Sequence, residues 1–104
     1  MIEFVKAHAE ILKKHELVAT GTTGSLIEKE GFRIEKKKPG PLGGDIQIAA
    51  MVVEDQISMV IFFLDVENKH PHEPDIQAFL RLCNLYDIPL ATNANTASLI
   101  IKNL

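Results

Sequence analysis

The feature that most constrains this fold is the stretch of residues 16–24, where a short apolar run ends in a turn of small residues and a helical pattern follows. This succession is typical of a β-strand that leads into a helix. Gly21 and Gly24 allow a tight turn, and the N–H groups and hydroxyls of Thr22 and Thr23 can then point at an oxyanion at the helix N-terminus. Simple helix capping uses the same residue types, so this turn alone leaves both interpretations open.

A second glycine-rich turn covers residues 39–45 and again precedes a helical pattern. Two such turns in one small domain predict a bound anion. The second turn also places Asp45 at or next to the start of a helix. In the helix that follows, Ile46, Ala49, Ala50 and Val53 recur at helical spacing, which predicts a packed face.

Helical and strand patterns alternate along the chain. The run of residues 58–65 is almost unbroken in its apolar character, as expected for a parallel strand covered by helices on both faces. Asn93 is expected to cap the last helix. The alternation predicts an α/β fold, three-layer α/β/α with a mainly parallel sheet, in a single domain of residues 1–104. An amphipathic helix is expected over residues 2–15, and shorter strands near residues 17–20, 32–35 and 88–91.

Composition narrows the class of protein. The formal net charge of -3 leaves no basic footprint, so nucleic acid is not an expected partner. No apolar run approaches the roughly 18 residues of a membrane span, and the N-terminus does not resemble a signal peptide. Cys83, the only cysteine, has the apolar spacing of a helix and is expected to be a reduced core thiol. These observations predict a cytoplasmic protein that has no membrane partner.

Several ionisable residues fall at strand ends or helix starts, where α/β folds place their ligand sites. A carboxylate and a histidine beside a phosphate site suit proton abstraction next to a carbonyl in a sugar phosphate. The residues expected at this edge, together with the Thr22 and Thr23 turn, are Asp45, Asp65, His72 and Asp75.

Each of these residues also has a simpler interpretation. Asp45 and Asp75 suit helix N-termini as charges alone, and His72 suits an exposed loop. His70 and His72 with Glu73 do not indicate a metal site, because no second cluster of ligands accompanies them.

Five motifs, taken in this order and spacing, resemble the methylglyoxal synthase family, and the likeness runs from about residue 4 to residue 101. The motifs are Ala19-Thr-Gly-Thr-Thr-Gly24, Gly40-Pro-Leu-Gly-Gly-Asp45, Ile61-Phe-Phe-Leu-Asp65, Pro71-His-Glu-Pro-Asp75 and Ala91-Thr-Asn93. The resemblance implies a methylglyoxal synthase-like fold. It also implies conversion of dihydroxyacetone phosphate to methylglyoxal and inorganic phosphate, without a metal or organic cofactor.

The resemblance also implies a role for each matching residue. Asp45 would be the catalytic base. The remaining roles follow the motifs: Thr22, Thr23 and Gly40 would hold the phosphate, Thr20 would line the site, His72 would attend the enediolate oxygens, and Asp65 and Asp75 would orient and tune these groups.

The sequence also departs from the family pattern. It starts at the helix after the family's first strand and ends before a C-terminal segment that carries an arginine, so we expect a shortened relative with weakened activity. Pro39, Ile46 and Val66 replace residues common in the family. A non-catalytic module that binds a small phosphorylated metabolite is the alternative function. The resemblance implies a homo-oligomer such as a hexamer.

Overall fold

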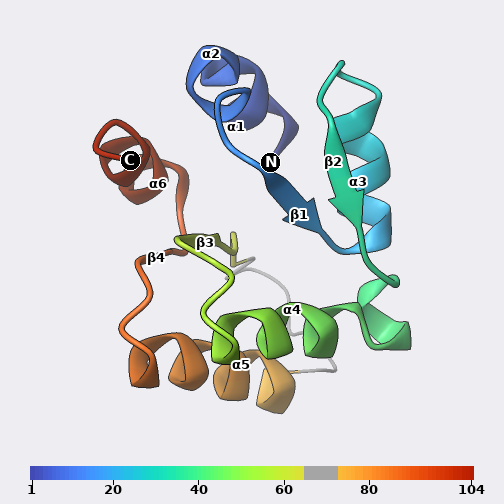
Figure 1. The fold of residues 1–104 in the computed structure, drawn as a ribbon, viewed down its shortest axis with the longest axis vertical. Helices are drawn as coiled ribbons and strands as arrows, with labels where there is room; N and C mark the ends of the chain where they lie inside the picture. The colour runs from blue at the N-terminus through green and yellow to red at the C-terminus, as the bar shows by residue number, and fades with distance from the viewer. Residues whose placement is uncertain (65–72) are drawn as a thin grey trace. The chain divides into compact units, whose positions relative to one another are not determined.

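The computed structural model describes residues 1–64 and 73–104, apart from the side chains of residues 73–75 (Figure 1). The chain divides into two compact units, Met1–Ala50 and Met51–Leu104.

The first unit is built on two parallel strands, β1 and β2, which lie side by side with α3 along them (Figure 1). Leu17 of β1 is opposite Ile34 of β2, and Lys37 N–H extends the pairing by donating to Ala19 O at 2.8 Å. The elements of this unit are α1 (Ile2–Ala7), α2 (Ala9–Leu12), β1 (Leu17–Ala19), α3 (Gly21–Glu28), β2 (Ile34–Lys36), the 3-10 helix η1 (Gly40–Leu42) and the first part of α4 (Gly44–Val53).

The first helix is shorter and less regular than predicted. Instead of one helix over residues 2–15, α1 and α2 are separated by His8, whose φ of -116° and ψ of 27° leave the helical region. The His8 ring lies 4.7 Å from the Phe4 ring, centroid to centroid. The predicted apolar face is nevertheless present, because Phe4, Val5 and Leu12 are buried.

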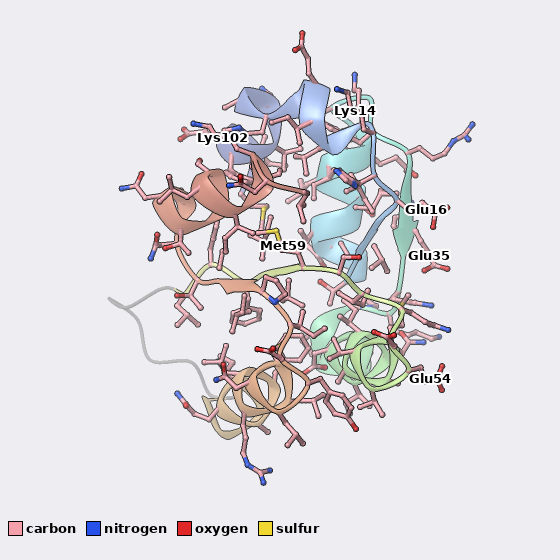
Figure 2. The ribbon with its side chains drawn as sticks, turned by 60° about the vertical axis from the view of Figure 1, so that its left-hand side comes forward. Lys14, Glu16, Glu35, Glu54, Met59 and Lys102 are labelled. Carbon is pink, nitrogen blue, oxygen red and sulfur yellow. The ribbon has the colours of Figure 1, made fainter. Side chains whose placement is uncertain are left out.

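Close packing joins α3 to β2. A methyl group on Gly24 would lie 2.7 Å from Lys36 Cγ, so a larger residue where the helix crosses the strand would displace the Lys36 side chain. Lys36 Nζ also donates to Glu28 Oε1 at 2.9 Å. The side chain of Glu35 points outward from the same strand (Figure 2).

The second unit contains another parallel pair, in which Val60 is opposite Leu90. The hydrogen bonds continue beyond the two short strands, because Phe62 N–H donates to Ala91 O at 2.8 Å and Leu64 N–H to Thr92 O at 3.3 Å. The strand predicted over residues 58–65 is therefore confirmed in part: it begins at Val60, its pairing reaches Leu64, and Asp65 lies outside the described residues. The elements are the last turn of α4, β3 (Val60–Ile61), α5 (Glu73–Leu85), β4 (Leu90–Ala91) and α6 (Ala94–Ile101).

A small core holds the second unit together. Its fully buried members include Val52 and Cys83. Burial raises the pKa of the Cys83 thiol, as expected for a neutral core residue, and the predicted core position is confirmed. The partly buried side chains around this core are Ile57, Phe62, Phe79, Leu82, Ile88 and Leu90.

The predicted face of α4 is wrong by one position. Ile46 and Val53 are 71% and 45% exposed, whereas Val52 is 1% exposed. Most of residues 46–53 are apolar, so two neighbouring helix faces fit the same spacing, and only packing decides between them. The predicted cap of α6 is confirmed, because Thr96 N–H donates to Asn93 Oδ1 at 2.9 Å.

Candidate active site

The first glycine turn is part of a helix. Thr20 is the N-cap of α3, with an extended backbone and no capping bond from its side chain, and Gly21 is the first helical residue. Gly21 N–H donates to Lys38 O at 3.1 Å. Within the described residues, the N–H groups of Thr22 and Thr23 have no acceptor, as is usual in the first turn of a helix. They can therefore bind an anion, favoured by the helix dipole.

Most backbone N–H groups of the second glycine turn donate to carbonyl oxygens within the turn. The N–H groups of residues 42–44 donate to the carbonyl oxygens of Pro39 and Gly40 at 2.9 to 3.1 Å. Pro39 and Pro41 have no N–H. Across residues 39–44, Gly40 therefore keeps the one N–H that has no acceptor in the described part of the chain.

The fold requires glycine at some positions of this turn and not at others. A methyl group on Gly44 would overlap Lys38 O, and Gly43 has a φ of 101°, which disfavours any other residue. At Gly40 no described atom beyond the two chain neighbours lies within 4 Å of the position that a methyl group would take, and the φ is not positive. The fold therefore requires Gly43 and Gly44, whereas Gly40 borders open space that a ligand can approach.

One short segment, residues 37–39, joins the two turns. A methyl group on Gly21 would lie 3.1 Å from Lys37 O and 3.2 Å from Pro39 N, so α3 begins directly against this segment. Lys38 N–H donates to Gln47 Oε1 on α4 at 2.8 Å. Because α3 and α4 both begin against residues 37–39, the free donors of both turns and the start of α4 lie in one region of the first unit.

Asp45 is the second residue of α4 and is partly buried. Its carboxylate has no hydrogen bond or ion pair in the described ranges 1–64 and 73–104. A carboxylate that is held by a helix and is not paired is available to accept a proton.

Three consecutive lysines, Lys36 to Lys38, precede the second turn, and two of them form ion pairs. Lys36 pairs with Glu28, and Lys37 Nζ lies 3.6 Å from Glu35 Oε2. The Lys38 ammonium has no ion pair among the described residues. Lys38 and Gln47 were not among the predicted site residues, because no local pattern reveals a hydrogen bond between residues nine positions apart; this bond joins the two turns.

The structure thus brings some predicted site residues together and leaves others untested. Asp65 and His72 lie outside the described residues, and Asp75 lies in the first turn of α5, with a side chain that is not described. The predicted site residues that lie in the first unit are Thr20, Thr22, Thr23, Gly40 and Asp45.

Metal-binding groups and membrane-spanning helices both bear on the class of protein. No group of three or more His, Cys, Asp or Glu side chains there could hold a metal ion. No helix in that part of the chain is long and apolar enough to cross a membrane.

Comparison with known proteins identifies the family. A family model described as the MGS-like domain matches residues 1–92. Methylglyoxal synthases of Geobacillus sp. (strain WCH70) and Bacillus subtilis (strain 168) are 51% and 49% identical to the chain, covering 100% of it and 75% and 77% of their own lengths. The chain belongs to the methylglyoxal synthase family. The predicted family is confirmed, and the relatives that match are methylglyoxal synthases, which are lyases.

A solved structure supports the same assignment for the fold. A crystal structure of methylglyoxal synthase from Elizabethkingia anophelis NUHP1 matches with a TM-score of 0.90 at 44% identity, covering 96% of this chain and 66% of that one. The chain thus spans just under two thirds of that solved methylglyoxal synthase. The predicted α/β fold class of methylglyoxal synthase type is confirmed.

Proposed function

We propose that this member of the methylglyoxal synthase family converts dihydroxyacetone phosphate to methylglyoxal and inorganic phosphate, with Asp45 as the base. One observation carries the proposal: the free N–H groups of Thr22, Thr23 and Gly40 and the unpaired carboxylate of Asp45 all lie in the unit Met1–Ala50. Together they offer donors for a phosphate and an acceptor for a proton.

The phosphate of the substrate binds at the two turns. The N–H groups of Thr22 and Thr23 donate to its oxygens at the start of α3, where the helix dipole favours negative charge. Gly40 adds a third N–H from the neighbouring turn and leaves room for close approach. Hydrogen bonds to charged groups contribute about 1.5 to 3 kcal/mol each, which suffices to orient a small substrate.

With the phosphate held, Asp45 removes a proton from the hydroxymethyl carbon. The C–H electron pair becomes the carbon–carbon double bond of an enediolate, and the former carbonyl oxygen takes the negative charge. As the enediolate collapses, its hydroxyl group gives up its proton and the oxygen forms the aldehyde carbonyl. The carbon–carbon double bond shifts to the carbon that bears the phosphate, and phosphate leaves with the C–O bonding pair and takes up the hydroxyl proton. The resulting enolate becomes methylglyoxal when its terminal carbon takes the proton that the base had removed, so no water is consumed and exclusion of water favours elimination.

The remaining roles come from the resemblance. His72 attends the enediolate oxygens, Asp65 and Asp75 orient and tune the reacting groups, and Thr20 lines the site next to the first turn. We also propose that the protein acts in the cytoplasm.

Turnover of dihydroxyacetone phosphate by the purified chain tests this function. We expect release of methylglyoxal and phosphate in equal amounts, and a fall in kcat of about 10³-fold in Asp45→Asn, because general-base catalysis contributes about 10² to 10⁴-fold. Asp55→Asn, a change of the same kind at an exposed position, is the control. A folded chain with no turnover that still binds phosphate would instead be a non-catalytic module.

We further propose that copies of the chain associate into a homo-oligomer such as a hexamer. Large apolar side chains support this, because Leu42 and Ile46 near the candidate site are 72% and 71% exposed. Light scattering at micromolar concentration tests it, and a monomer would contradict it.

A further inference from the structure

Both backbone polar groups of Lys38 are hydrogen-bonded. Its carbonyl oxygen accepts from Gly21 N–H, at the first residue of α3, and its N–H donates to Gln47 Oε1, from the fourth residue of α4. We infer that Gln47 is a positioning residue, which sets the distance between the phosphate-binding turns and the helix that carries Asp45. This inference rests on the proposed function of those turns.

The covalent chain alone does not fix the position of α4 relative to Lys38. Between Lys38 and Gln47 the backbone passes through Gly40, Gly43 and Gly44, and glycine has the greatest conformational freedom. The Gln47 side chain closes this stretch with a 2.8 Å bond. A second hydrogen bond, from Gly44 N–H to Pro39 O at 3.1 Å, also holds the start of α4. Loss of the Gln47 side chain therefore makes the position of α4 relative to Lys38 less fixed, but the helix start stays attached.

The phosphate donors and the base lie on different sides of this bond. Thr22 and Thr23 are held with α3, which is bonded to Lys38 through Gly21, and Gly40 follows Lys38 by two residues. Asp45 lies on α4, two residues before Gln47. Breaking the bond therefore changes the position of the base relative to the bound phosphate more than it changes the phosphate site itself.

Two replacements at position 47 separate the hydrogen bond from the shape of the side chain. Gln47→Met keeps the length of the side chain and removes the amide oxygen, whereas Gln47→Glu keeps an acceptor for Lys38 N–H. Position 47 is exposed, so solvent and salt screen the added charge. Gln56→Met, the same change at an exposed position in the other unit, is the control.

Steady-state kinetics is the first measurement. In Gln47→Met we expect kcat to fall about fivefold, the effect of one hydrogen bond, while KM and the inhibition constant of inorganic phosphate stay within about twofold. Gln47→Glu should restore kcat to within about twofold of the original chain. A loss of phosphate affinity as large as the loss in kcat would overturn the inference, because it would indicate a general structural role, and so would an unchanged kcat.

Amide hydrogen exchange, followed by NMR, is a measurement that needs no turnover. Gln47→Met should speed exchange at Lys38 several-fold and leave Gly24 unchanged, since Gly24 N–H donates to Thr20 O within the other helix. Unchanged exchange at Lys38 overturns the inference whether or not the chain is active. Absence of turnover in the original chain, with Lys38 responding as expected, contradicts the proposed function alone.

Discussion

The two glycine turns look alike in sequence, yet they are built differently. The turn before α3 becomes the first turn of the helix itself and leaves the N–H groups of Thr22 and Thr23 free. The turn before α4 is a 3-10 helix whose N–H groups at residues 42–44 bond within the turn, so across residues 39–44 only Gly40 keeps a donor that has no acceptor in the described part of the chain. Glycine-rich turns with the same pattern can thus serve mainly as ligand donors or mainly as backbone geometry.

The second turn contains both kinds of glycine within five residues. Gly44 is required because a methyl group there would overlap Lys38 O, whereas at Gly40 the described residues leave open space for one. Substitutions that add one methyl group therefore test which part of the turn serves the fold and which part serves the ligand.

The largest effect is expected for Gly44→Ala. The added methyl group would overlap Lys38 O, a backbone atom that cannot move without disturbing both turns. We expect the free energy of unfolding to fall by about 3 kcal/mol, the upper part of the range for overpacking. Urea denaturation measures this change. A loss below about 1 kcal/mol would mean that this turn is not held by its backbone contacts.

Gly40→Ala should have the opposite pattern. Its methyl group meets no atom of the described residues beyond its chain neighbours, and its φ is not positive, so stability should stay the same or rise by about 0.5 kcal/mol. The same methyl group would occupy the proposed phosphate site, and we expect phosphate to bind about tenfold more weakly, which corresponds to about 1.4 kcal/mol. Titration calorimetry with inorganic phosphate measures this. Unchanged affinity would remove Gly40 from the site.

Gly21→Ala tests the junction between the turns. The methyl group would lie 3.1 to 3.3 Å from backbone and ring atoms of Lys37 and Pro39, which is tight without overlap. We expect a loss of about 1 kcal/mol in the free energy of unfolding, less than for Gly44→Ala. Thermal unfolding of both variants side by side checks the order, and equal losses would show that the two turns are packed alike.

The smallest effect is expected for Thr22→Val, which removes a hydroxyl and keeps the backbone N–H. If the N–H groups of α3 bind the phosphate, affinity should fall less than about threefold, because the donor at the helix N-terminus is still present. Phosphate titration measures this as well. A loss as large as that of Gly40→Ala would transfer the main role to the hydroxyl, and Thr96→Val in α6 controls for effects on stability.

Local patterns predicted much of this molecule correctly. The parallel strands, the buried Cys83 and the Asn93 cap follow from apolar spacing and capping chemistry, which involve residues close together in the chain. The break at His8 and the buried face of α4 were not predicted. The residues of α4 are apolar on more than one side, so their pattern fits two faces equally well.

The family, the α/β class and the residue types at the candidate site can all be predicted from the amino-acid sequence, because motifs and periodicity involve neighbouring positions. Which donors in the two turns remain free, and that Lys38 and Gln47 join the turns, depends on the folded arrangement. Whether a backbone N–H is free depends on which carbonyl oxygen reaches it in space. That depends on packing between segments distant in the chain, which no local pattern specifies.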